Sequence, residues 1–121
     1  REKVKRMNLK KLSELQEEGK SIDEIIGVIK SGNNKQSEFD ISESGINNFG
    51  YNLMGQGKTN EALRIFKLNT ELYPEGFNTW DSYGECLLAL EQKEEGIAAY
   101  KKSLALNPNN KGAERIINEN E

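Results

Sequence analysis

The feature that most constrains the fold of this chain is a repeat with a period of 34 residues. Pro74 and Pro108 are separated by this distance, and shifting the sequence by the same number superposes apolar and glycine positions over two segments. Residues 43–76 and 77–110 are therefore two copies of one unit. The aligned pairs are Ile46 with Trp80, Phe49 with Tyr83, Gly50 with Gly84, Leu53 with Leu87, Ala62 with Gly96, Leu63 with Ile97, Phe66 with Tyr100 and Leu72 with Leu106. A period of this length indicates stacked copies of one supersecondary element.

Each copy has the apolar spacing of two amphipathic helices. In the first copy we expect Ser42 to cap the first helix and Gly57 to stop it, because serine favours helix starts and glycine favours helix ends. In the second copy we expect a helix over 78–91, capped by Asn78, and another over 93–106.

The flanking segments also show helical patterns. A helix is expected over 2–18, with Val4, Met7, Leu12 and Leu15 on one side. Ser21 and Glu24 have the spacing of a capping box that opens a helix to about Ser31, with Ile22, Ile25, Ile26 and Ile29 as its apolar stripe. Residues 31–40 are a polar loop. Residues 111–120 are expected to form a closing helix that packs through Ala113, Ile116 and Ile117.

The two copies resemble the tetratricopeptide repeat, whose pattern is W-x2-L-G-x2-Y, then A-x3-F, then P. The second copy carries Trp80, Tyr83, Gly84 and Leu87, then Gly96, Tyr100 and Pro108. The resemblance implies an all-α fold: a right-handed α-α superhelix of two such motifs flanked by N-terminal helices and a C-terminal capping helix. It also implies a repeat domain over 39–121, preceded by a helical segment and loop over 1–38. Trp80, Tyr83 and Tyr100 are then expected in the core.

A narrower resemblance is carried by four runs: FDISESGINNFGY at 39–51, EALRIFKLNTELYP at 61–74, NTWDSYGE at 78–85 and AAYKKSLALNP at 98–108. They resemble the C-terminal repeat module appended to bacterial serine hydrolases of the β-lactamase and penicillin-binding-protein kind, and to related esterases. The chain starts with Arg1 and contains no S-x-x-K motif. The resemblance therefore implies that it is the C-terminal part of a larger bacterial protein, whose catalytic domain would lie upstream of residue 1. A bacterial cytoplasmic and a periplasmic location both remain open.

The charge distribution argues against nucleic acid as a partner. The net charge is −3, but residues 1–20 carry +3 and residues 21–121 carry −6. An acidic body repels a phosphate backbone. No apolar run approaches the roughly 20 residues that a membrane-spanning helix needs. With one cysteine, Cys86, no internal disulfide can form, and its place among core positions predicts a buried and unreactive thiol.

No catalytic or metal-binding constellation is present, so we expect neither an enzyme nor a bound cofactor. The chain has no histidine, which excludes Ser-His-Asp and Cys-His nucleophiles and removes the commonest metal ligand. Ser82 stands beside Asp81, but neighbouring helical residues point apart. Asp81 is instead expected to serve the free N–H groups in the first turn of its helix.

The remaining candidate for a functional surface is the concave face of the array. In arrays of this kind, the first helix of each repeat lines this face. The resemblance assigns it positions 2, 5, 9 and 12 of each repeat. These are Ser44, Asn47, Tyr51, Met54, Asn78, Asp81, Glu85 and Leu88. The mixture suits an extended or helical protein segment, from another protein or from the chain's own upstream domain. The acids oppose a clamp for a C-terminal carboxylate. A solvated or intramolecular surface and weak self-association are the alternatives.

Overall fold

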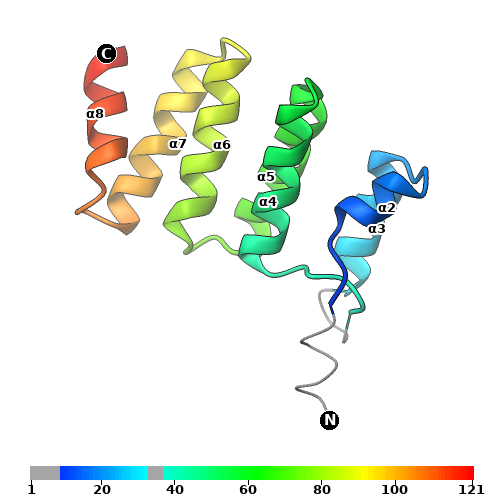
Figure 1. Cartoon of the computed structure of the whole chain (residues 1–121). Coiled ribbons are helices and arrows are strands. Elements are labelled where there is room, and N and C mark those ends of the chain that lie inside the picture. The colour runs from blue at the N-terminus through cyan, green and yellow to red at the C-terminus, as the bar shows by residue number, and fades with distance from the viewer. Residues whose placement is uncertain (1–8, 33–36) are drawn as a thin grey trace.

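The computed structural model describes residues 9–32 and 37–121, and these residues form an array of helices packed in adjacent pairs (Figure 1). The predicted all-α fold class is confirmed. The helices of this part of the chain are α2 (Ser13–Glu17), α3 (Ile22–Gly32), α4 (Glu43–Gly55), α5 (Thr59–Leu72), α6 (Phe77–Ala89), α7 (Lys93–Leu106) and α8 (Lys111–Asn120). In each repeat a helix of 13 residues is followed by one of 14.

Two of the predicted caps are confirmed by their hydrogen bonds. Ser42 Oγ accepts from the Gly45 amide at 3.1 Å and opens α4. At the start of α3, the Ser21 amide donates to Glu24 Oε1 at 2.8 Å while the Glu24 amide donates to Ser21 Oγ at 3.1 Å. The same bonds hold the pKa of Glu24 below its usual value. Local side-chain chemistry thus sets both helix starts.

The start of α6 corrects a prediction. The helix begins at Phe77, its N-cap is Gly76, and Asn78 lies inside the first turn with its side chain exposed. Gly76 stands 34 residues after Ser42, so the repeat register places the cap here although glycine offers no side-chain acceptor.

The ends of α4 and α6 share one turn geometry. Gly57 has φ +80°, and Glu91, which occupies the equivalent position of the second copy, has φ +63°. In both turns the next amide donates back to the leucine at the helix end, from Lys58 to Leu53 and from Gln92 to Leu87, at 2.9 Å in each case. The predicted stop at Gly57 is confirmed. Helix α6 ends at Ala89, two residues before the predicted Glu91, because the left-handed backbone conformation of Glu91 does not continue a helix.

Glu91→Gly is expected to raise the free energy of unfolding by about 1 kcal/mol, because a left-handed conformation costs an L-residue about 1–2 kcal/mol and costs glycine almost nothing. Urea denaturation followed by helical circular dichroism measures the change. The reciprocal control, Gly57→Ala, has open space for its methyl group and should lose a similar amount through backbone strain alone. Equal stability of Glu91→Gly and the parent would contradict this explanation.

Within the described residues 9–18, only part of the helix predicted over 2–18 forms. Residues 1–8, and with them Val4 and Met7, lie outside the described part, and α2 covers only 13–17. Lys10 instead forms an isolated parallel bridge with Phe39: the Lys10 amide donates to Glu38 O at 2.9 Å and the Asp40 amide donates to Lys10 O at 2.8 Å. Pairing with a distant segment therefore replaces the local helix at residues 9–12.

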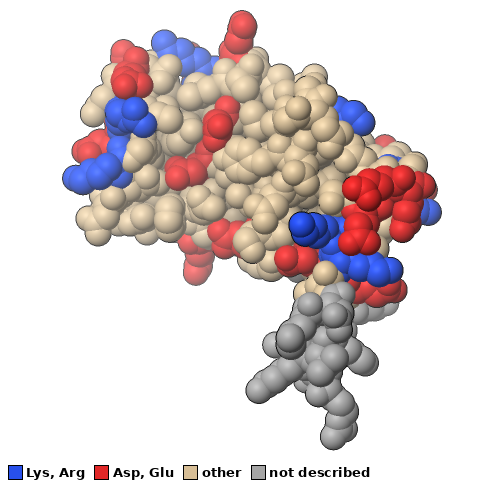
Figure 2. All heavy atoms as spheres, in the orientation of Figure 1, with Lys and Arg blue, Asp and Glu red and all other residues tan. Residues whose placement is uncertain are grey.

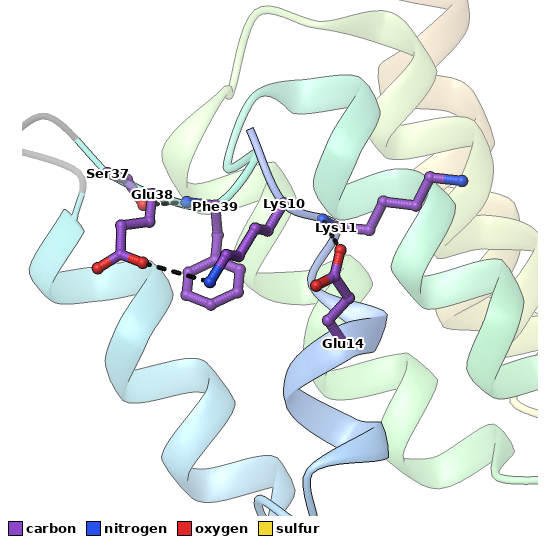
Figure 3. A network of polar contacts seen from close by, with 6 residues as sticks. All are labelled: Lys10, Lys11, Glu14, Ser37, Glu38 and Phe39. Carbon is purple, nitrogen blue, oxygen red and sulfur yellow. Dashed lines mark hydrogen bonds and ion pairs between the residues drawn. The ribbon is translucent and has the colours of Figure 1, made fainter. Parts of the chain in front are cut away.

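Side chains reinforce this bridge (Figure 3). The Lys10 ammonium lies 3.7 Å from a Glu38 carboxylate oxygen and 5.9 Å from the centre of the Phe39 ring. The Phe39 amide donates to Ser37 Oγ at 3.0 Å, and the Lys11 amide donates to Glu14 at the start of α2. These contacts attach the chain before α2 to the strand-like segment that leads into α4.

One apolar core joins the N-terminal helices to the repeats. Leu12, Leu15, Ile25 and Ile29 are buried in the same cluster as Ile46, Phe49, Leu53, Phe66 and Cys86. A second cluster holds Ile97, Tyr100, Ala113 and Ile117, with Ile116 partly buried against it. The predicted closing helix, α8, is thus confirmed. The division between residues 38 and 39 stays a prediction.

Two of the three aromatic residues expected in the core are only half-buried. Tyr100 is buried, whereas Trp80 and Tyr83 are partly exposed and pack edge to face with ring centres 6.3 Å apart. Trp80 Nε1 donates to Pro74 O at 2.9 Å, and Lys102 lies over its ring. The indole needs a partner for its N–H, and it finds one at the rim, in the turn before α6.

A buried polar side chain links the two helices of each repeat. Asn69 Nδ2 donates to Glu43 O at 3.0 Å, and Ser103 Oγ donates to Phe77 O at 2.9 Å. Both donors are fully buried and each lies 26 residues after its acceptor. Each therefore ties the second helix of its repeat to the first residue of the first helix.

Candidate functional site

The predicted concave-face residues lie on α4 and α6, and one pair of them meets directly. Tyr51 Oη donates to Glu85 Oε1 at 2.7 Å, and it also lies 3.2 Å from Ser82 Oγ. Tyr51 and Glu85 occupy the same position of the two repeats. The contact therefore joins α4 to α6 at equivalent positions and makes a continuous surface across the two helices.

The Tyr51 ring is fixed from below. It packs edge to face on Phe66 with ring centres 5.0 Å apart, and 37% of the residue remains exposed. Burial raises the pKa of Tyr51 to about 12, and the nearby carboxylates of Glu85 and Asp81 also raise it. The phenol is thus a neutral donor whose proton is already directed at Glu85.

Asp81 has a partner that the sequence analysis did not anticipate. Asn110 Nδ2 donates to both Asp81 carboxylate oxygens, at 3.0 and 3.2 Å, while Asn110 Oδ1 accepts from the Ala113 amide and caps α8. The expectation that Asp81 serves the first turn of its own helix is wrong, because Asn110 reaches it from the start of the next helix. The sequence does contain a signal for the position of Asn110 at a helix start: it lies one repeat length after Gly76, the N-cap of α6.

The other predicted face residues differ in their accessibility. Ser44 and Asn78 are exposed, and Asn47 is half-buried with its Oδ1 atom buried and without a donor. Met54 is half-buried against the first core cluster, and Leu88 against the second, where it lies over Gly96 of α7. The open part of the face is therefore polar and centred on Tyr51, Asp81 and Glu85.

The helix pair α6–α7 matches a known family of helical repeats. A family model described as tetratricopeptide repeat matches residues 77–110, which are the bounds of the second copy. Residues 77–110 form a tetratricopeptide repeat. Residues 43–76 share its helix lengths, its turn and its aromatic-on-glycine packing, Phe66 on Gly50 and Tyr100 on Gly84. No curated protein matches the chain.

Ser82 lies beneath this surface of the tetratricopeptide repeat and is fully buried. Its hydroxyl contacts the phenol of Tyr51, which is neutral and donates its proton to Glu85. Nothing in this contact would remove a proton from Ser82. Within residues 9–32 and 37–121 there is also no group of three or more Cys, Asp or Glu side chains placed to hold a metal ion, and no helix long and apolar enough to cross a membrane.

Cys86, behind the same helix face, is expected to be unreactive in the folded chain. It is fully buried, its Sγ lies 3.5 Å from Thr59 O, and burial raises the pKa of the thiol to about 11. Because the thiolate is the reactive form, Ellman's reagent should label it only after unfolding in urea. Rapid labelling of the native chain, at the rate seen in urea, would show that the helix packing opens.

Proposed function

We propose that this chain is a non-catalytic interaction module that binds a protein or peptide on the face formed by α4 and α6. The observation that carries the proposal is the Tyr51–Glu85 contact, which joins equivalent positions of two tetratricopeptide helices into one exposed polar surface. Arrays of this kind present such surfaces to extended segments or helices of other proteins.

Site-specific photocrosslinking tests this proposal in the cell of origin. A photoreactive phenylalanine derivative would replace Asn78, which is exposed on the face, or Lys67, which is exposed on α5. We expect a discrete crosslinked protein from position 78 and none from position 67. Adding Asn47→Ala and Tyr51→Ala should remove the product. Equal products from both positions, or none from position 78, would count against docking on this face.

A second candidate function rests on the four runs at 39–51, 61–74, 78–85 and 98–108. Their resemblance to modules appended to bacterial serine hydrolases supports a role as an accessory or regulatory domain of such an enzyme. The docked partner would then be the protein's own upstream domain. An S-x-x-K motif upstream of Arg1, together with altered melting or substrate range after deletion of residues 39–121, is the expected result. Unchanged melting and kinetics would exclude it.

A further inference from the structure

The face formed by α4 and α6 is distinguished by the absence of positive charge. Residues 42–57 and 76–92, which contain both helices and their flanking turns, include no Lys or Arg. The second helices do carry them, at Arg64, Lys67, Lys93, Lys101 and Lys102. Figure 2 shows the consequence: the middle of this face, over α4 and α6, has acidic groups within a wide uncharged area and no basic groups.

The same face has an excess of hydrogen-bond acceptors. Glu85 receives the Tyr51 hydroxyl on one oxygen, and no bond to its other oxygen occurs in the described part of the chain. Asp81 receives only the Asn110 amide, and the ion pairs of these ranges include neither acid. Because the Tyr51 proton is already committed, a ligand here must supply donors of its own.

The two acids are placed to act on one group. Asp81 and Glu85 are four residues apart in α6, so their side chains neighbour one another on the helix surface. Both raise the pKa of Tyr51 and of Tyr100 beneath the face, after the larger effect of burial. A guanidinium or ammonium group placed here, between α4 and α6, would meet both carboxylates.

We propose that the preferred occupant of this face is a segment of another protein that carries Lys or Arg among apolar residues, with one cation seated between Asp81 and Glu85 beside Tyr51. This inference rests on the proposed docking function and specifies its partner chemistry. An acidic tail or a phosphate backbone would be repelled by the same acids. The cation supplies the missing donors, and neighbouring apolar residues would cover the exposed edge of Tyr51.

Selection from a random library of 12-residue peptides displayed on phage tests the inference with the whole 121-residue chain. We expect the enriched peptides to be net positive and to contain Lys or Arg. The strongest peptide is then synthesised with a fluorescent label, and its affinity is measured by anisotropy. Asp81→Asn with Glu85→Gln keeps the side-chain shapes and leaves one oxygen at each position to accept from Asn110 and Tyr51, and it should weaken binding at least about tenfold. Raising the salt concentration should weaken parent binding more than that of this double variant.

The matched control is Glu71→Gln with Glu94→Gln, which makes the same change in net charge at exposed sites on α5 and α7. We expect it to change the affinity less than about twofold, because screened charges outside the contact contribute little. An equal loss in both double variants would reduce the effect to net charge and overturn a specific cation site.

The remaining outcomes separate this inference from the function on which it rests. Enrichment of neutral or acidic peptides, or basic peptides insensitive to Asp81→Asn with Glu85→Gln, overturns the inference and leaves docking intact. A library that yields no binder also overturns it, and the crosslinking result at position 78 then decides on docking itself. Sedimentation of the same sample measures self-association. If the parent chain is a dimer and the Asp81→Asn, Glu85→Gln variant is a monomer, the occupant of the face is a second copy of this chain, and the inference of a segment from another protein is overturned.

Discussion

Asn69→Asp is expected to lower the free energy of unfolding by about 3–5 kcal/mol at neutral pH, the usual cost of leaving a buried charge without a partner. Asn69 is completely buried, and its Nδ2 atom donates to Glu43 O at 3.0 Å. Aspartate has the same shape but places an oxygen against that carbonyl oxygen. The other side-chain oxygen already lacks a donor, so neither carboxylate oxygen would be stabilised. Urea denaturation of variant and parent measures the difference.

The pH dependence of this loss has a defined sign. Burial without a donor raises the pKa of the introduced carboxyl above its unfolded value. As the pH rises, the unfolded chain therefore ionises first, and stability is lost until the folded pKa is passed. The deficit relative to the parent should be small near about pH 4, where the protonated acid can still donate to Glu43, and should grow toward neutrality.

Asn60→Asp is the matched control, because Asn60 is exposed in the first turn of the same helix. A negative charge there faces the positive end of the helix dipole, and the change in stability should stay within about 0.5 kcal/mol. A deficit of Asn69→Asp that is no larger than that of the control, or that shrinks as the pH rises, would contradict the buried hydrogen bond between α5 and α4.

Gly50→Ala is expected to lower the free energy of unfolding by about 1–3 kcal/mol, the usual cost of overpacking a filled core. A Cβ atom at Gly50 would lie 2.6 Å from Cζ and 2.8 Å from Cδ1 of Phe66, and this ring is fully buried. The ring cannot move away freely, because Tyr51 packs on it. Alanine recovers about 1 kcal/mol of helix propensity, which offsets part of the clash.

Gly55→Ala in the same helix separates packing from propensity. Nothing lies within 4 Å of a Cβ at Gly55, so the variant should gain up to about 1 kcal/mol from propensity alone. Opposite signs for the two variants are the expected result in urea denaturation. A gain at both positions would show that α4 and α5 can separate without cost, and that the close approach at Gly50 does not stabilise the repeat.

The sequence by itself determined the architecture of this protein. The 34-residue period, the apolar spacing and the glycine–aromatic pairs predicted two helix pairs and a closing helix, and Ser42 and Ser21 predicted two helix starts. Each of these features either lies within a few residues of the chain or recurs at the same position of both repeats, so it can be recognised in the sequence. Hydrophobic periodicity encodes which side of a helix is buried, and a cap is formed by residues within three positions of each other. The pairing of Gly50 with Phe66 follows once the two helices of a repeat are known to pack.

Only the tertiary structure decided which polar groups meet. The Tyr51–Glu85 bond depends on how closely α4 and α6 stack, and Asp81 is bound by Asn110 because α8 starts beside α6. Lys10 leaves the predicted helix because its backbone pairs with Phe39. Each of these contacts joins residues 29 to 34 positions apart, and no pattern within one helix encodes them. Helix packing sets these distances, and with them the acceptor-rich face on α4 and α6.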